Sequence, residues 1–360
     1  MKPVPFPIEA LATEVRLRDS RVAGERLVWL ERRGGKGVLV RWNGVPQDLT
    51  AGIDVGSSLG YGGGDFDLAG DLVVFVQDGA LWQLALDAGE PTRLTPSFGQ
   101  AASPAISPDL GRVAYVHRDD DVDRLAIVAT DGRSWPVILA QGADFYMQPA
   151  WSPDGEHLAW VEWDFPAMPW TSSRLMLATL GHGTPSGVDA VAGGDGVGVF
   201  QPLFSADGRS LYYVDNEGET DRLVRLDLAS RSREVLLTGA IMEAAFDQGM
   251  RCMSLGPGGA LYVRSSQEGA ATLHRIDPAG TTDAPVSLAG YTWLSRPCGD
   301  AQRLVAVAES PTCPPRLVEW RGGDWTTLRF ASAERHEPWL SRGRHITFEN
   351  ADGRQVLIIL

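Results

Sequence analysis

The sequence predicts an all-β protein built from a repeated unit. Each copy contains a turn that ends in glycine, a hydrophobic strand, a polar turn and a second strand. The turn markers are Gly24, Gly70, Gly111, Gly155, Gly208 and Gly259, and Gln302 takes the equivalent place in a seventh copy. Successive markers lie 41 to 53 residues apart, and a period in the forties with about four short strands per unit is typical of a β-propeller blade. We therefore expect a seven-bladed β-propeller.

The composition favours the same fold class. The 360 residues include 41 glycines and 23 prolines, which are too many turn formers for a helical protein and suit many short strands. Hydrophobic residues make up 44% of the chain. That fraction supports a packed core and argues against disorder.

The predicted blades follow one another along residues 16–330, and each has two strands that can be recognised from the hydrophobic pattern. In chain order the paired segments are Val22–Leu30 with Val38–Trp42, Phe66–Val76 with Leu81–Leu84, Pro104–Val116 with Leu125–Val128, Pro149–Val161 with Leu175–Ala178, Pro202–Val214 with Leu223–Asp227, Gly258–Val263 with Leu273–Ile276, and Arg303–Val307 with Arg316–Trp320. The turn Ser152-Pro153-Asp154-Gly155 shows the local logic, because proline sets φ and glycine takes the left-handed corner.

Three segments lie outside this pattern. Residues 1–15 form an N-terminal segment in which Ile8–Val15 favours a short helix. Ile241–Phe246, between the fifth and sixth copies, fits a helical turn or a strand. Residues 331–360 form a linker followed by a β-hairpin that turns at Asp352-Gly353.

The net charge and the cysteine content limit the classes of partner and the cellular compartment that we expect. The formal net charge of −14 argues against nucleic acid or an anionic membrane as a partner, because both require a cationic face. No apolar run is long enough to span a membrane, and the N-terminus lacks the apolar segment of a signal peptide. Cys252, Cys298 and Cys313 form no C-x-x-C pair, which favours free thiols and a cytoplasmic protein.

Several motifs suggest chemistry that their context does not support. Gly56–Gly60 matches the G-x-S-x-G pattern of a nucleophile elbow, but neither a buried strand precedes it nor a helix-forming sequence follows it. Asp119, Asp121 and Asp123 resemble the opening of a calcium loop without its glycine and its bidentate glutamate. The six histidines have no zinc spacing. We therefore predict no catalytic residue, metal site or cofactor in this chain, and no activity from the chain alone.

The stretch from Asp144 to Trp170 holds the candidate site. Glu162, Trp163, Asp164 and Trp170 belong to an insertion in the fourth repeat, and Asp144 and Tyr146 shortly precede it. Acidic groups among aromatic rings suit the cationic N-terminus of a peptide, through charge and cation–π attraction. The alternative is that the aromatic rings pack the insertion while the carboxylates accept hydrogen bonds from backbone N–H groups.

The same stretch carries a family resemblance. D-F-Y-M-Q-P-A-W-S-P-D-G at 144–155 and W-D-F-P-A-M-P-W at 163–170 resemble the propeller of the prolyl oligopeptidase (S9) family of serine peptidases, in its acylaminoacyl-peptidase and dipeptidyl-peptidase-like branch. Tyr61-Gly62-Gly63-Gly64 and Val199-Phe200-Gln201-Pro202 also match that branch. Two positions differ, since Phe165 and Ala167 stand where the family has His and Asn.

The resemblance implies a function for the chain. In that family an α/β-hydrolase domain with a Ser-Asp-His triad follows the propeller, and the hairpin at 344–360 resembles its opening. The chain is then a fragment or a shortened protein whose propeller gates the access of short peptides to a catalytic domain. One alternative is a free-standing TolB-like propeller that acts as a protein–protein interaction module. Another is a propeller enzyme such as a lactonase, but that would need metal ligands on the axis.

Overall fold

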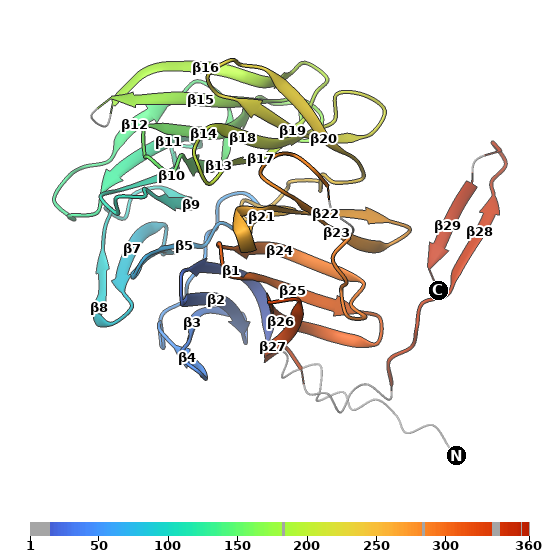
Figure 1. The fold of residues 1–360 in the computed structure, drawn as a ribbon. Helices are drawn as coiled ribbons and strands as arrows, with labels where there is room; N and C mark the ends of the chain where they lie inside the picture. The colour runs from blue at the N-terminus through green and yellow to red at the C-terminus, as the bar shows by residue number, and fades with distance from the viewer. Residues whose placement is uncertain (1–14, 182–183, 283–284, 333–338, 354, 360) are drawn as a thin grey trace.

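The chain folds into a ring of seven antiparallel sheets (Figure 1). The computed structural model describes all residues except 1–14, 182–183, 283–284, 333–338, 354 and 360. Over the described residues, six of the ring's sheets have four strands, the sixth in chain order has three, and the strands follow one another as simple meanders. This arrangement confirms the seven-bladed β-propeller.

The strands of the first four blades are β1 (Arg16–Ala23), β2 (Arg26–Arg33), β3 (Lys36–Trp42) and β4 (Pro46–Asp48); β5 (Phe66–Ala69), β6 (Leu72–Gln77), β7 (Ala80–Ala85) and β8 (Ala88–Arg93); β9 (Gln100–Ile106), β10 (Arg112–Asp119), β11 (Val122–Ala129) and β12 (Val137–Ala140); and β13 (Phe145–Trp151), β14 (His157–Trp163), β15 (Ser173–Gly181) and β16 (Thr184–Gly194). The first strand of each blade lines the axis of the ring, and the fourth lies at the rim (Figure 1).

The remaining blades contain β17 (Val199–Phe204), β18 (Ser210–Asp215), β19 (Asp221–Asp227) and β20 (Arg233–Gly239); β21 (Met253–Leu255), β22 (Leu261–Gln267) and β23 (Ala270–Ile276), with the short 3-10 helix η1 (Pro257–Gly259); and β24 (Trp293–Gly299), β25 (Leu304–Ser310), β26 (Cys313–Arg321) and β27 (Asp324–Phe330). The hairpin β28 (His345–Glu349) and β29 (Gln355–Ile359) lies apart from the ring in Figure 1.

The turn between the first two strands explains why the repeat is visible in the sequence. In the fourth blade Ser152 Oγ donates a hydrogen bond to Asp154 and accepts one from the His157 N–H at 2.8 Å. Gly155 takes the left-handed corner with φ of 70°. The third and fifth blades repeat the Ser-to-Asp bond. In the third blade, however, Leu110 rather than Gly111 has the positive φ, at 60°.

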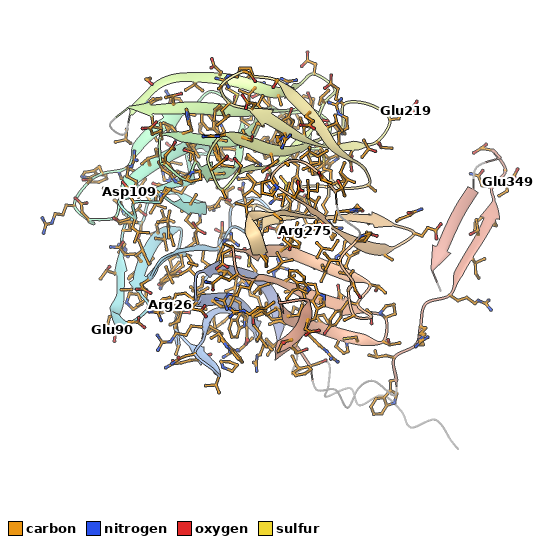
Figure 2. The ribbon with its side chains drawn as sticks, in the orientation of Figure 1. Arg26, Glu90, Asp109, Glu219, Arg275 and Glu349 are labelled. Carbon is orange, nitrogen blue, oxygen red and sulfur yellow. The ribbon has the colours of Figure 1, made fainter. Side chains whose placement is uncertain are left out.

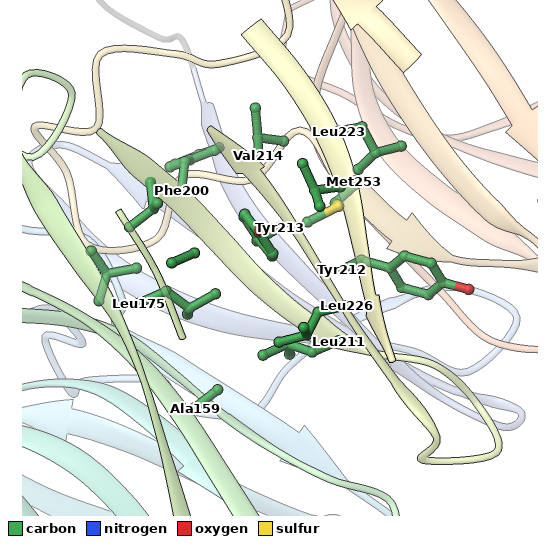
Figure 3. Packing of buried hydrophobic residues seen from close by; sticks show 14 of the residues in the cluster. Ala159, Leu175, Phe200, Leu211, Tyr212, Tyr213, Val214, Leu223, Leu226 and Met253 are labelled. Atoms are coloured by element: carbon green, nitrogen blue, oxygen red, sulfur yellow. The ribbon is translucent and has the colours of Figure 1, made fainter. Parts of the chain in front are cut away.

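The core lies between neighbouring blades. Figure 3 shows Tyr213 and Leu211 of the fifth blade against Leu175 of the fourth. Met253 of the sixth blade packs on the other side of the same cluster. Because each sheet buries both of its faces against the next blade, its central strands are apolar throughout, as the repeat predicted.

The surface is polar and acidic by contrast. In Figure 2 the labelled Glu90, Asp109 and Glu219 lie at the rim of the ring, and all three are exposed. No helix in the described part of the chain has the length and apolar character needed to cross a membrane.

Among the described residues, no strand is shared between the first and last blades of the ring. In the described chain β1 pairs within the first sheet, and β24–β27 form the seventh sheet by themselves. Side chains join the two blades instead: Arg303 donates to the carbonyl oxygens of Gly24 and Arg26, each at 2.8 Å. Arg329 donates to the buried Glu31 at 2.7 Å.

One face of the ring carries the chain's entry and exit. The Val15 N–H donates to the Ala331 carbonyl at 3.2 Å, so the chain enters β1 and leaves β27 at neighbouring points. In a four-stranded meander, the start of the first strand, the loop between the second and third strands, and the end of the fourth strand lie on the same side. We call this side the entry face. It also carries the connections between blades.

Some local expectations need correction. Ile241–Phe246 forms neither a helical turn nor a strand, because the segment runs as an irregular connection toward the ring axis. The fourth blade's first strand begins at Phe145 rather than Pro149, which instead follows a bulge inside that strand. The expected helix at Ile8–Val15 falls on residues 8–14, outside the described residues, apart from Val15.

Candidate functional site

The insertion of the fourth blade is the loop 164–172 between β14 and β15, on the entry face. It is irregular, as its two prolines predicted, but Glu162 and Trp163, which were expected in it, are the last two residues of β14. Its own hydrogen bonds shape it: the Thr171 N–H donates to the Met168 carbonyl at 2.8 Å, and Ser173 Oγ donates to the Pro169 carbonyl at 2.7 Å. The loop is therefore a folded unit with a fixed conformation.

Trp170 is anchored through its backbone. Asn216 Nδ2 donates to the Trp170 carbonyl at 2.8 Å, which ties the loop to the fifth blade. Gly198 approaches so closely that a Cβ there would lie 2.6 Å from the Trp170 carbonyl carbon. Only glycine fits at 198, and the indole of Trp170 is left half-buried at the face.

The carboxylates of the insertion are already engaged. Glu162 accepts hydrogen bonds from Trp160 Nε1 at 2.9 Å and from Arg174 at 3.3 Å. Asp164 accepts from Arg174 at 2.9 Å and from the Asp144 N–H at 3.2 Å. Asp144 in turn accepts from the Phe165 N–H at 2.9 Å. The carboxylates thus hold the loop through Arg174 and the backbone.

Arg174 neutralises much of the acidic charge here. Partial burial lowers the pKa of Arg174, but its hydrogen bonds and charge contacts with Asp164 and Glu162 outweigh burial and leave the pKa above its ordinary value. The guanidinium therefore stays charged between the two carboxylates. One guanidinium offsets one of the three negative charges of Glu162, Asp164 and Asp144, and each of these carboxylates also makes contacts within the protein.

Two of the aromatic candidates belong to the packing beneath the face. Trp163 is only 9% exposed, and its ring stacks on Phe145 with centroids 5.1 Å apart. Tyr146 is fully buried, and its hydroxyl accepts a hydrogen bond from the Ala143 N–H at 3.0 Å. Burial raises the pKa of Tyr146 to about 12.

A cavity of about 220 Å³ opens beside the insertion. Its apolar walls come from Leu59, Tyr61, Phe145, Met147, Trp163, Phe165, Ala167, Met168, Pro169, Trp170, Ala245 and Phe246. These residues belong to the insertion, to the strands β13 and β14, and to the connections that precede the second and sixth blades. Segments far apart in the sequence therefore build one apolar pocket on the entry face.

The mouth of this cavity exposes large apolar side chains. Tyr61 is 84% exposed and Phe165 is 77% exposed. Phe246 is half exposed and meets Tyr61 edge to face, with centroids 6.1 Å apart. Contiguous exposed aromatic groups at a concave site are typical of a binding surface.

Asp123 is a pocket residue that the sequence did not reveal. It lines the cavity together with Arg118, whose Nε lies 2.5 Å from Asp123 Oδ1. Its other oxygen, Oδ2, is buried and has no hydrogen-bond partner among the described residues. Burial raises the pKa of Asp123, and Arg118 opposes that effect. Asp123 Oδ2 is thus a buried acceptor without a described partner, behind the pocket wall.

The rejected motifs are structural. Ser58, the nucleophile position of G-x-S-x-G, lies in an irregular connection between β4 and β5 with no helix after it. Asp120 and Asp121 form the tight turn between β10 and β11, both with positive φ. No group of three metal-ligating side chains occurs in the described part of the chain.

Comparisons with known proteins identify the fold. No family model and no curated protein matches the sequence. A puromycin-hydrolysing peptidase of Mycobacterium tuberculosis matches with a TM-score of 0.88 and 25% identity, over 99% of this chain and 60% of that protein. A puromycin hydrolase matches with a TM-score of 0.84 and 25% identity, over 95% of this chain and 58% of that protein. Prolyl oligopeptidase B of Galerina marginata matches with a TM-score of 0.71 and 12% identity, over 97% of this chain and 55% of that protein.

The chain has the fold of the propeller part of these peptidases and hydrolases. The expected resemblance is confirmed by the solved structures that this chain matches, which are peptidases and hydrolases with the same propeller fold. This chain spans less than two thirds of the length of each of those three proteins.

Proposed function

We propose that this propeller gates the access of short peptides to a serine peptidase active site. The catalytic partner is an α/β-hydrolase domain with a Ser-Asp-His triad that meets the entry face. The observation that carries the proposal is the apolar pocket beside Trp170, on the same face where the chain enters and leaves the ring. A domain joined after Ala331 is best placed to lie on this face.

The similar proteins support the reaction class. Two of them are named for the hydrolysis of puromycin and are about 25% identical to this chain over nearly its whole length. We infer that the intact protein cleaves an amide bond in small substrates of comparable size. The three free cysteines agree with the cytoplasm as its location.

The pocket is suited to one large apolar side chain of the substrate. A dry cavity of about 150 Å³ is enough to bind benzene, and this one measures about 220 Å³. Phe165 and Ala167, which replace the family's polar pair, extend the apolar wall.

The pocket favours a neutral group over an ammonium group. Neither Glu162 nor Asp164 lines the pocket, and Asp123, which does, is paired with Arg118. A cation that enters an apolar cavity loses its hydration, and that loss costs several kcal/mol unless an unpaired charge compensates. We therefore propose that Trp170 and Trp163 act through their rings, while Glu162, Asp164, Asp144 and Tyr146 position the loop.

Calorimetric titration with N-acetyl-phenylalaninamide tests this pocket. We expect the Trp170→Ala chain to bind the probe about tenfold more weakly or worse, because a large indole wall is lost. The matched control is Trp135→Ala, since Trp135 is 71% exposed and lies outside the pocket. We expect its affinity to equal that of the unmodified chain.

The same titration with phenylalaninamide, which is cationic, tests the preference for neutral groups. Weaker binding of the cation than of the acetylated probe is the expected result. Tenfold tighter binding of the cation, lost in a Glu162→Gln chain, would instead assign the site to a peptide N-terminus. Equal affinities of the Trp170→Ala and Trp135→Ala chains would exclude the pocket as the binding site.

A further inference from the structure

The segment Asp247–Met253 crosses the centre of the ring on the entry-face side. Apart from Met253, which begins β21, it has no regular secondary structure. It is nevertheless buried: Asp247 is 3% exposed, Gln248 is 8% exposed and Cys252 is not exposed. An irregular segment buried at the axis must have its backbone groups satisfied by its surroundings. We call it the axial segment.

The innermost strands bend to meet the axial segment. Four of them contain a non-glycine residue in the left-handed region immediately before a proline: Ser103, Gln148, Gln201 and Arg296, with φ between 48° and 54°. Each coincides with a shift in strand register. A positive φ before proline is unfavourable, and β-bulges commonly serve to re-aim a side chain.

The bulge side chains hold the axial segment from three blades. Ser103 Oγ donates to Gln248 Oε1 at 2.8 Å, and Gln148 Nε2 donates to the Met250 carbonyl at 2.9 Å. Gln201 Oε1 accepts the N–H groups of Cys252 and Met253, at 2.7 and 3.0 Å. The strained residues therefore supply the partners that the buried backbone needs.

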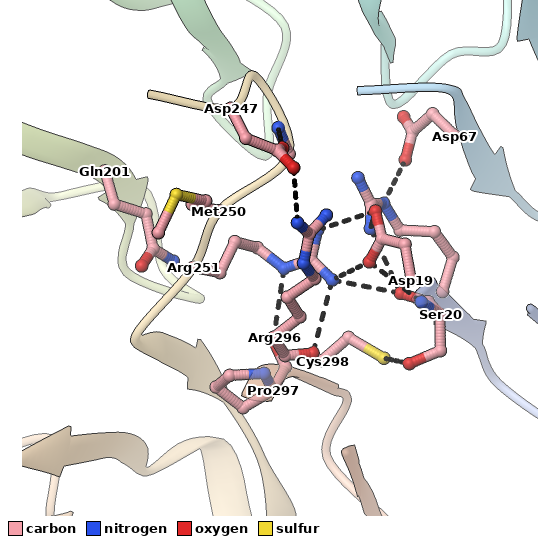
Figure 4. Close-up of polar contacts among 12 residues, drawn as sticks. Asp19, Ser20, Asp67, Gln201, Asp247, Met250, Arg251, Arg296, Pro297 and Cys298 are labelled. Atoms are coloured by element: carbon pink, nitrogen blue, oxygen red, sulfur yellow. Dashed lines mark hydrogen bonds and ion pairs between the residues drawn. The ribbon is translucent and has the colours of Figure 1, made fainter. Parts of the chain in front are cut away.

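Charged contacts fix the axial segment across the seam between the seventh and first blades (Figure 4). The bulge residue Arg296 lies 2.7 Å from Asp247 Oδ2. Arg251 lies 2.5 Å from Asp19 Oδ1 and also donates to the carbonyl oxygens of Ser20 and Pro297. These contacts bridge the first and seventh blades, which share no strand among the described residues.

The connection that precedes the second blade also contacts the axial segment. The Gln248 N–H donates to the Gly62 carbonyl at 3.1 Å. At Gly63 an added Cβ would overlap Asp247 Oδ1, and at Gly249 it would lie 2.8 Å from the Gly64 nitrogen. The two backbones are in direct contact, with no room for a side chain between them.

What remains of the axial channel is a cavity of about 360 Å³. The innermost strands of all seven blades line it, and Gln248, Gly249, Met250 and Arg251 close it on the entry-face side. The apolar pocket beside Trp170 shares only Gln248 with the lining of this cavity.

We infer that the axial segment is a built-in plug that seals the propeller channel, so peptides reach the entry face from its side and not along the axis. The plug rests on side chains from the bulges of the inner strands, and it joins the first blade to the seventh. The route of the peptide rests on the proposed function, whereas the seal itself does not.

Hydrogen exchange of the full chain, followed by mass spectrometry, tests the seal without any ligand. We expect the amides of residues 248–253 to exchange as slowly as those of the neighbouring inner strands, although the segment is irregular. In the Gln201→Ala chain we expect their exchange to accelerate at least tenfold. The matched control Gln302→Ala removes an exposed glutamine from the turn before β25 and should change nothing.

The thiol of Cys252 provides a second readout. It is fully buried at the end of the plug, and burial raises its pKa to about 12, whereas Cys313 is partly exposed. Maleimide should label Cys313 first, and Gln201→Ala or Gln148→Ala should speed the labelling of Cys252. Exchange of residues 248–253 at the rate of an open loop in the unmodified chain would overturn the seal, as would labelling of Cys252 as fast as Cys313.

The route is tested by filling the channel. Ala150 lines the channel cavity and not the apolar pocket. The substitution Ala150→Trp therefore narrows the axial channel and leaves the walls of the pocket intact. We expect the association rate of N-acetyl-phenylalaninamide to be unchanged. A tenfold slower association would show entry along the axis and overturn the proposed route. Absence of binding to both chains, with slow exchange of the plug retained, would refute the proposed pocket and leave the seal standing.

Discussion

At the scale of single residues, Asp19 is the charge on which the axial network depends. Its side chain is 1% exposed and lies between Arg21, at 2.7 Å, and Arg251, at 2.5 Å. Burial alone would raise its pKa, but the charges of Arg21, Arg251 and Arg296 outweigh burial and hold the pKa far below the usual range. Asp19 therefore stabilises the folded ring in its ionised form.

The sign of this linkage gives a pH prediction. Because the folded pKa is depressed, the contribution of Asp19 is complete above the unfolded pKa of about 4 and is lost as the pH falls toward the folded pKa. We expect Asp19→Asn to lower the free energy of unfolding at pH 7 by about 3 kcal/mol, since two arginines lose a buried partner. Urea unfolding at pH 7 and pH 3 measures the effect. A deficit that is as large at pH 3 as at pH 7 would contradict this role.

At the scale of elements, the blades could be predicted and the plug could not. Gly155 and its equivalents mark turns through local φ requirements, and the apolar strands follow from burial on both faces. The bulges were visible only as Ser-Pro, Gln-Pro and Arg-Pro pairs within the strands. Nothing local indicates that Ser103 meets Gln248, which lies 145 residues away.

The candidate site could likewise be predicted only where its signals are local in the sequence. The insertion and its aromatic content could be recognised because they interrupt a repeat. The partners of Glu162 and Asp164 depend on Arg174 across the hairpin β14–β15, and Asp123 reaches the pocket from another blade. The pair of Glu162 and Arg174 follows from the register of that hairpin. The position of Asp123 beside the pocket follows from the packing of neighbouring blades.

The contact between Gly63 and the plug gives a prediction at this scale. Gly63 has φ of 83°, and an added methyl group would overlap Asp247. We expect Gly63→Ala to lower the free energy of unfolding by about 3 kcal/mol, from left-handed strain and overpacking together. Gly44→Ala, with φ of 76° and open space around it, should cost only about 1 kcal/mol, for strain alone. If urea unfolding shows equal losses of unfolding free energy in the Gly63→Ala and Gly44→Ala chains, the close contact does not contribute to stability.

At the scale of the whole molecule, the ring combines a sealed axis with an open face. Side chains of Arg303, Arg329 and Arg251 close the seam between the first and seventh blades, where no described strand is shared. The exposed aromatic groups Tyr61, Phe165 and Phe246 gather on the face where the chain enters and leaves. If a catalytic domain covers that face, the apolar pocket is placed to bind an apolar side chain of the substrate.

The central claim is that this propeller serves a serine peptidase domain, and the coding DNA beyond codon 360 tests it most directly. We predict an in-frame α/β-hydrolase segment that contains G-x-S-x-G, followed by an Asp and then a His. A stop codon after Leu360, in a genome whose separate hydrolase chains do not bind this protein, would contradict the claim and would favour a free-standing interaction module.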